Sequence, residues 1–253
     1  MTALKRTETW RMTLSPSRSR CGGLHVTIAG ERCVMRCSGA LHVLDHDVLI
    51  AADLHLEKGS AYAARGQMLP PYDSAATLSR LEDEIADLNP ARVVLLGDSF
   101  HDRRSIPRMA ETDLRSLERM AFGRDWLWLE GNHDRDALGT DLDRLPGSVI
   151  ETLSLGALRL VHEPQAGDQP GEVAGHLHPS ATVVAHARRV RRPCFITDGQ
   201  RVILPAFGAF TGGLNVRDPA IAGLFVSLPL AAAPLAVVLG RDRVHPIAWG
   251  ALV

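Results

Sequence analysis

Five short apolar runs in this sequence each end in polar residues. The runs VLIAA, VVLL, WLWL, LRLV and VA are followed by DLH at 53–55, GD at 97–98, GNHD at 131–134, His162 and GHLH at 175–178. A short apolar run that stops at polar residues is typical of a buried strand that passes into a loop. Because the carboxyl ends of strands in an α/β sheet face one crevice, these distant segments are expected to converge there.

The segments between these runs predict an α/β arrangement. Residues 73–90 place Leu78, Leu81, Ile85 and Leu88 three and four apart, and Pro90 ends the pattern. A second helix is predicted over 107–122, with a proline in its first turn and Gly123 at its end. Strands alternating with helices imply a parallel sheet, whereas the short turns after residue 148 predict antiparallel strands.

Length and composition favour one domain. The 253 residues are 45% hydrophobic, enough for one large core. We predict a disordered basic tail over 1–22, where five basic residues precede position 21, and a single domain over 23–253. The four cysteines lack C-x-x-C spacing, and no apolar secretion signal opens the chain, so a cytoplasmic protein with reduced thiols is expected.

Two further features limit the class of function. A net charge of −1 argues against coating nucleic acid by bulk electrostatics, so any contact with a polyanion must be local. The uncharged run 219–240 is interrupted by Gly223, Ser227, Pro229 and Pro234, so it predicts two buried strands joined by a turn rather than a membrane span.

Each polar cluster taken singly has an ordinary structural explanation. Asp-x-His and Gly-Asp are common at turns, GNHD could cap a helix, and a lone histidine after a strand is more often hydrogen-bonded than a metal ligand. All five clusters nevertheless occur in order, each after an apolar run, and together they supply only side chains that bind metals. The sequence therefore predicts a metal centre.

The ordered set D-x-H, G-D, G-N-H-D, H and G-H-x-H resembles the calcineurin-like metallophosphoesterase superfamily over about residues 48–180. The resemblance implies a metallophosphoesterase fold, a four-layer α/β sandwich of two packed mixed β-sheets flanked by helices. It also implies two divalent metal ions and a hydrolase. One metal would be held by Asp53, His55, Asp98 and His178, and the other by Asp98, Asn132, His162 and His176.

The chemistry of such a centre suits phosphoester hydrolysis. One carboxylate can bridge two cations about 3.5–4 Å apart, which is the role implied for Asp98. The cations act as Lewis acids and acidify a bridging water, creating a hydroxide that attacks phosphorus. The oxygen and nitrogen ligands suit manganese, iron or zinc, and the resemblance favours Mn²⁺.

His133 is the second catalytic candidate besides Asp98. The resemblance implies that it contacts the phosphate and protonates the departing oxygen, for which imidazole has a suitable pKa. A purely structural histidine beside the site is the alternative. The chain departs from the G-D-x-x-D-R pattern of protein phosphatases, which puts that activity in doubt and leaves His101, Asp102 and Asp134 as candidate partners of His133.

A narrower resemblance lies between the motifs. The stretches LLGDSFHD, AGHLHP, RRPCFI and ILPAFGAFTGG are similar to the ligase-associated DNA-damage-response endonuclease family, PdeM, over about residues 40–217. This resemblance implies manganese-dependent cleavage of single-stranded DNA in bacterial DNA repair, and functional association with a DNA ligase and a helicase. It leaves the oligomeric state open, a homodimer included.

Basic residues near the motifs are candidates for binding DNA. Arg103 and Arg104 follow Asp98 closely enough to touch phosphates that flank a scissile one. The cluster at 188–192 could instead be a solvated hairpin, because its arginines alternate faces on a strand. The glycines of 205–213 lack the lysine and spacing of a P-loop, so we expect a tight turn that closes the site.

Two other functions fit the sequence less well. A small-molecule phosphodiesterase or nucleotide pyrophosphatase suits the near-neutral net charge, and a metal-free binding module would need fewer of these ligand-type side chains.

Overall fold

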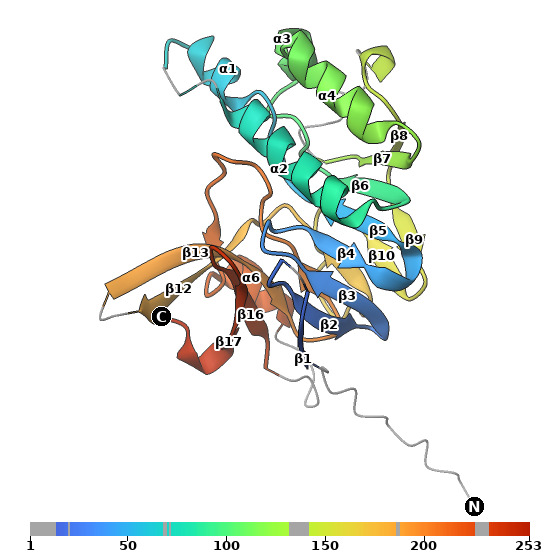
Figure 1. The fold of residues 1–253 in the computed structure, drawn as a ribbon. Coiled ribbons are helices and arrows are strands. Elements are labelled where there is room, and N and C mark those ends of the chain that lie inside the picture. The colour runs from blue at the N-terminus through green and yellow to red at the C-terminus, as the bar shows by residue number, and fades with distance from the viewer. Residues whose placement is uncertain are drawn as a thin grey trace, which may run out of the picture.

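The computed structural model of the chain describes residues 14–19, 21–67, 70, 72–131, 142–185, 188–225 and 233–253. Figure 1 shows the strands in two stacks, with helices α1 to α4 along one side of the first stack. The polar clusters that follow the strands lie in loops between these elements.

The first sheet has eight strands in chain order. β1 to β5 pair antiparallel, and β5 to β8 pair parallel. The strands are β1 (Leu14–Arg18), β2 (Leu24–Ile28), β3 (Glu31–Met35), β4 (Leu41–Val43), β5 (Val48–Ala51), β6 (Arg92–Leu96), β7 (Asp125–Leu129) and β8 (Ser148–Ile150). A 3-10 turn, η1 (Leu44–His46), joins β4 to β5.

The second sheet has nine strands, with seven in the order β15-β12-β13-β14-β11-β10-β9 and with β16 and β17 attached beside β13. The strands are β9 (Leu153–Leu155), β10 (Leu158–Leu160), β11 (Glu172–Ala174), β12 (Pro179–Ala185), β13 (Arg188–Thr197), β14 (Val202–Ile203), β15 (Leu214–Asn215), β16 (Leu235–Leu239) and β17 (Val244–Ala248). The pairs β10/β11, β11/β14 and β12/β15 are parallel, so the expectation of a wholly antiparallel second half is wrong and the sheet is mixed.

The helices cover the outer faces of the sheets. They are α1 (Lys58–Ala63), α2 (Asp73–Leu88), α3 (Ser105–Arg108), α4 (Glu111–Ala121) and α6 (Pro219–Ala222), with 3-10 turns η2 (Leu142–Arg144), η3 (Gly223–Phe225) and η4 (Trp249–Ala251). As predicted, α2 buries Leu78, Leu81 and Ile85 on one face and ends before Pro90, with Asn89 in the left-handed region.

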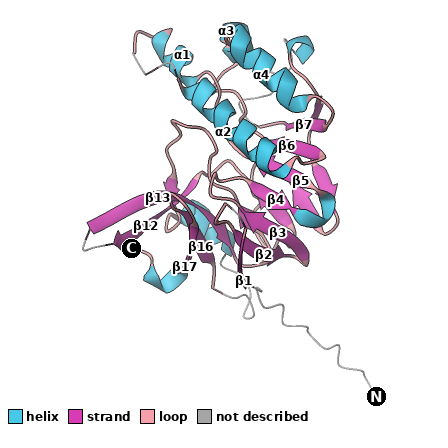
Figure 2. Ribbon diagram, in the orientation of Figure 1, coloured by secondary structure: helices cyan, strands magenta, loops and turns pink. Residues whose placement is uncertain are grey.

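Three apolar clusters separate four layers. One lies between the two sheets and includes Ile50, Val94 and Phe195. A second joins the first sheet to α2 and α4, and a third joins the second sheet to α6 and η3. Figure 2 shows the larger helices gathered on the outer face of the first sheet. The predicted four-layer α/β sandwich of two mixed sheets is therefore confirmed.

Two segments differ from their sequence predictions. The single helix expected over 107–122 is interrupted at Met109 and Ala110, which are extended, and α4 begins at Glu111. This start places Glu111 and Asp113 in the first turn, where negative charge favours the helix dipole. The first strand expected within 219–240 is wrong for residues 219–225, where the Asp218 carboxylate caps α6 and Pro219 begins it. Residues 226–232 lie outside the described residues, and β16 is the expected second strand.

The amino-terminal prediction also differs from the structure. Leu14–Arg18 form β1 on the edge of the first sheet, so the predicted disordered tail over 1–22 is wrong for these residues. Backbone pairing with β2 orders them without requiring an apolar pattern. Residues 1–13 and 20 lie outside the described residues. Within the described part of the chain, each helix is too short or too polar to cross a lipid bilayer.

A buried ion pair ties the first sheet to α2, and breaking it should destabilise the fold. Arg36 is 3% exposed and donates from Nε to Glu84 at 2.6 Å and from Nη2 to Asp87 at 2.5 Å. We expect Arg36→Met to lower the free energy of unfolding by about 3 kcal/mol, because it leaves a buried carboxylate unpaired. Denaturant unfolding at pH 7 measures this change.

The exposed pair between Arg115 and Glu111 supplies the control, because its side chains are 69% and 67% exposed. Arg115→Met should change stability little, since solvent screens that pair. Adding Glu84→Gln to Arg36→Met should recover part of the loss. Equal effects of the two arginine substitutions would contradict the role given to Arg36.

Candidate metal centre

Six of the predicted ligands lie in loops at the junction of the two sheets. Three come from the first sheet and three from the second: Asp53 and His55 follow β5, Asp98 follows β6, His162 follows β10, and His176 and His178 lie between β11 and β12. Parallel pairing of β5 with β6 brings the first two loops together, and parallel pairing of β10 with β11 does the same for the others. The packing of one sheet on the other then joins the two halves.

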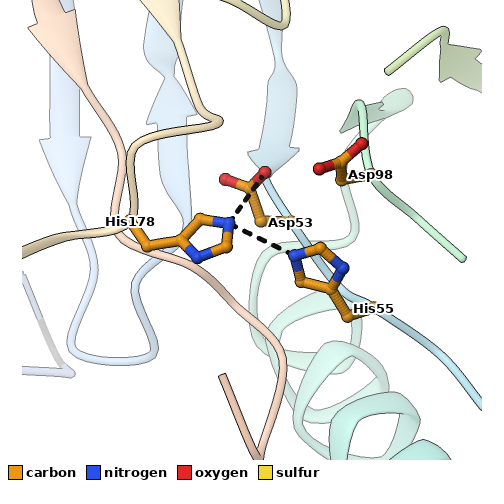
Figure 3. A group of neighbouring side chains, drawn as sticks. All are labelled: Asp53, His55, Asp98 and His178. Carbon is orange, nitrogen blue, oxygen red and sulfur yellow. Dashed lines mark hydrogen bonds and ion pairs between the residues drawn. The ribbon is translucent and has the colours of Figure 1, made fainter. Parts of the chain in front are cut away.

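The first group consists of Asp53, His55, Asp98 and His178, which offer ligand atoms within 4.8 Å of one another. His178 Nε2 lies 3.4 Å from Asp53 Oδ1 and 3.2 Å from His55 Nε2. Figure 3 shows the His178 ring directed at both neighbours, with the Asp98 carboxylate on the far side of Asp53. These are the four residues expected for one metal.

The second group consists of Asp98, His162 and His176, under the same distance limit. His162 Nε2 lies 3.3 Å from Asp98 Oδ1 and 3.2 Å from His176 Nδ1. Asp98 belongs to both groups, as expected for the carboxylate that the family resemblance implies would bridge the two metals. The structure thus brings together six of the seven predicted ligands.

The seventh ligand, Asn132, and the catalytic candidate His133 lie outside the described residues, as does Asp134. Two of the other candidate partners of His133 are described. Asp102 is paired with Arg108 at 2.8 Å, and the His101 ring lies 5.8 Å from Tyr62 and 6.2 Å from His55, measured between centroids.

The backbone at the ligands is unusual. Asp53, His55, Asp98, His176 and His178 all have positive φ, between 45° and 68°. Such left-handed residues cost of order 1 kcal/mol or more each unless the surroundings impose them, and they cluster at functional sites. Here the two first-sheet loops hold each other: Asp53 N–H donates to Gly97 O at 3.1 Å, and His55 N–H donates to Asp98 O at 3.0 Å.

Glycines of the motifs allow the ligands to pack against backbone. A Cβ atom on Gly97 would lie 2.1 Å from His162 Nδ1, and one on Gly131 would lie 2.6 Å from Asp98 Oδ1. A Cβ on Gly175 would lie 2.7 Å from Asp53 Oδ2. All three distances are too short for non-bonded atoms. A side chain at the glycine that opens each of these motifs would therefore collide with a ligand from a different motif.

The loop 205–213 lies against the site, in agreement with the turn expected there, and it supports the Asp53 backbone. Gly208 N–H donates to Asp53 O at 3.1 Å, and Ala206 pairs with Ala52. A Cβ on Gly208 would meet Leu54 O at 2.3 Å, and one on Gly213 would meet His178 O at 2.5 Å. The glycines of this segment were the available signal, but they did not identify which backbone they approach.

The surroundings of His55 and His162 shift the pKa values of these two buried histidines in opposite directions. Desolvation, reinforced by the charge of His178, lowers the pKa of His55 to about 3. Burial acts on His162 in the same direction, but hydrogen bonding to Asp98 and the charges of Asp98 and Asp53 outweigh it and raise the pKa of His162. His55 is therefore neutral near pH 7 and can offer a lone pair, whereas in His162 the protonated form is favoured and competes with a cation.

The residues present fit divalent cations. Ligand atoms each about 2.0–2.2 Å from one ion lie on the order of 3–3.5 Å apart. The four contacts between candidate ligands, at 3.2 to 3.4 Å, fall in this range. Imidazole and carboxylate ligands without thiolate suit manganese, iron or zinc.

Comparisons with known proteins agree with this geometry. The sequence pattern described as calcineurin-like phosphoesterase matches residues 46–199. The crystal structure of Pseudomonas putida nuclease MPE has a TM-score of 0.66 and 30% identity, covering 89% of this chain and 100% of that chain. The structure of Yfce, a phosphoesterase from E. coli, has a TM-score of 0.40 and 16% identity over 79% of this chain and 98% of its own, too weak a likeness to support an argument. Among curated proteins there is no match.

The packing of Gly97 against His162 can be tested separately from its backbone conformation. Gly97 and Gly123 have similar φ values, 73° and 76°, but a Cβ on Gly123 would meet nothing within 4 Å. Alanine at either position should cost about 1 kcal/mol of stability through its left-handed backbone. Only Gly97→Ala should also reduce the manganese retained after dialysis, measured by mass spectrometry. Similar metal loss in both variants would refute the steric role.

Cation binding should tighten as pH rises, because protons compete for His162. At pH 6.5 its raised pKa keeps more than half of the metal-free protein protonated at this residue. Calorimetry in two buffers of different ionisation enthalpy should therefore detect proton release on Mn²⁺ binding at pH 6.5, and less release at higher pH. Affinity that is constant from pH 6 to 8, without proton release, would contradict the assignment of His162.

Proposed function

The chain belongs to the calcineurin-like phosphoesterase family, and on that premise we propose that it is a manganese-dependent endonuclease that cleaves single-stranded DNA. The observation that carries the proposal is the pair of candidate ligand groups that share Asp98 at the sheet junction. Likeness to a nuclease over that protein's full length supports phosphodiester cleavage rather than monoester cleavage. The choice of single-stranded DNA follows the resemblance of the stretches between the motifs.

Six of the described residues are placed to hold the two cations. Asp53, His55 and His178 would hold one divalent cation, His162 and His176 the other, and Asp98 both. When bound, the two cations supply Lewis acidity and lower the pKa of water to near neutrality. Asp53 is held for this purpose by the His176 N–H, which donates to both of its carboxylate oxygens at 3.1 and 2.9 Å. His133 is the residue that we propose to protonate the leaving oxygen.

The surroundings of the site bear on the substrate. Arg103 and Arg104 are exposed in the loop after Asp98, and Arg104 is the residue before α3. We propose that they contact phosphates of the DNA backbone beyond the scissile one. Mn²⁺ as the metal, a role in cytoplasmic DNA repair, and association with a DNA ligase and a helicase also belong to this proposal.

The small-molecule alternative differs in what it requires of the protein surface. A phosphodiesterase or nucleotide pyrophosphatase acting on small substrates needs no contact with flanking phosphates, and the net charge of −1 suits it. A metal-free binding module has no use for two groups of metal-ligand side chains. Substrate choice therefore separates the first two classes, and turnover separates both from the third.

We expect purified protein with Mn²⁺ to nick circular single-stranded DNA faster than it hydrolyses cyclic dinucleotides or dinucleoside polyphosphates. Conversion of circular to linear strands on denaturing gels measures nicking, and release of nucleotides measures the alternatives. Preferential hydrolysis of the small substrates would favour the alternative enzyme. No turnover even of an activated aryl phosphodiester would favour the binding module.

Two variants divide metal binding from proton transfer within this experiment. Asp98→Ala should abolish turnover and reduce bound manganese, since Asp98 belongs to both ligand groups. His133→Ala should slow turnover while most of the metal is retained, because general acid catalysis contributes typically 100-fold or more. Equal metal loss in both variants would contradict these roles.

A further inference from the structure

A pocket lies beside the candidate metal centre and shares His178 with it. The pocket is open to solvent, has a volume of about 210 Å³ and is lined by the start of β12, the middle of β13 and the loop 205–213. Its lining includes Ser180, Arg191, Thr211 and Gly212 besides His178. The lining thus includes a candidate metal ligand, His178, and two arginines of β13, Arg191 and Arg192.

The orientation of Arg191 follows from the register of the hairpin. Thr182 pairs with Arg191 and Ser180 with Pro193, whereas Ala181 pairs with Arg192. Ala181 is buried in the apolar cluster shared with α6, so the intervening residues lie on the opposite face, toward His178. Arg189 and Arg191 share that face, and Arg192 alternates to the other, although it also contributes to the pocket lining.

The guanidinium of Arg191 is held in place at the pocket. Its Nε donates to Ser180 Oγ at 2.7 Å, and its Nη2 donates to Gly213 O. Nη1 has no protein acceptor among the described residues, and the side chain has no ion pair there. A cation that is fixed by neutral partners keeps its charge available for an anion and loses little entropy when it binds one.

The opposite wall is fixed as well. Ala209 N–H donates to Thr77 Oγ1 at 3.0 Å, and Lys58 Nζ donates to Phe210 O at 3.0 Å, which tie the loop to α2 and α1. The buried Thr211 hydroxyl oxygen has no hydrogen-bond partner within the described part of the chain. The loop wall is therefore held in place, and the pocket offers the Arg191 cation beside His178.

We propose that this pocket binds the phosphate adjacent to the scissile phosphate of a single-stranded nucleic acid, with Arg191 as the positioning residue. The inference rests on the proposed nuclease function. It implies that the strand leaves the metal centre past His178 and continues into this pocket. The hairpin arginines are thereby separated: Arg191 binds substrate, and Arg189 on the same face lies outside the pocket lining. A contact of this kind exists only in a polymer or a substrate with a second phosphate.

The experiment compares Arg191→Gln with Arg189→Gln, which removes the same charge from the same face of β13. Glutamine keeps an amide donor for Ser180 but loses the bond to Gly213 O, and the bonds to α1 and α2 should still hold the loop. Binding of a fluorescent dodecathymidylate to metal-free protein is measured by anisotropy at several salt concentrations. Each phosphate contact on a single strand contributes about 0.7 to the slope of log K against log salt. Arg191→Gln should therefore reduce the slope by about 0.7. Its loss of affinity relative to the wild type should be about fivefold greater at 0.1 M salt than at 1 M salt.

Turnover of a small aryl phosphodiester with Mn²⁺ completes the test. Arg191→Gln should leave kcat/KM for this substrate unchanged and lower kcat/KM for single-stranded DNA, while Arg189→Gln should do neither. Equal losses of DNA binding in the two variants would overturn the pocket and leave the nuclease proposal intact. Wild-type protein that binds the oligonucleotide through Arg191 but does not cleave DNA would overturn the nuclease proposal and keep the pocket.

An effect of Arg191→Gln through loop displacement has a different signature. It would lower turnover of the aryl substrate as well, because the loop supports Asp53 through Gly208. That outcome would assign Arg191 a structural role and overturn the inference. Ser180→Ala keeps the charge but removes one brace, so a smaller loss of DNA binding is expected from it.

Discussion

Burial of two carboxylates close together is the constraint on which this structure depends. Asp53 is 0% exposed and Asp98 is 3% exposed, and both face the same histidines. Like charges removed from water are costly unless cations or hydrogen-bond donors offset them. The His176 amide serves Asp53, the charge of both carboxylates raises the pKa of His162, and a pair of divalent cations would neutralise the remainder. Burial of the two carboxylates is therefore costly in the absence of cations, and for the same reason it favours cation binding at this site.

That constraint couples the site to the packing of the two sheets. The first sheet supplies both carboxylates, and the second supplies three of the four described histidines. Distances such as the 3.4 Å between His178 Nε2 and Asp53 Oδ1 are thus set across the apolar cluster between the sheets. Since that cluster is close-packed, it holds the ligand groups at a fixed separation, and a change of volume there would be felt at the metal centre.

The sequence predicted the parts of this arrangement that are local and repeated. Each ligand follows an apolar strand, so their convergence followed from the rule that strand ends share a crevice, and α2 followed from its apolar spacing and Pro90. The break before Glu111 and the short helix after Asp218 were missed, because brief capping effects competed with a longer apolar pattern. The support of Asp53 by Gly208 depends on a contact between segments far apart in sequence, which no local pattern encodes.

A net charge of −1 is compatible with a polyanionic substrate because the relevant charges are separated by position. Asp53 and Asp98 are buried, and bound cations would make the net charge beside them positive, while Arg191 and the arginines after Asp98 are exposed. An approaching phosphodiester would therefore meet the exposed arginines first. The negative charge of the buried carboxylates would not repel it, because the bound cations would offset that charge. Recognition by a few arginines near the centre, of which Arg191 is held by hydrogen bonds, would favour a strand that can bend into the site, in keeping with the proposed single-stranded DNA substrate.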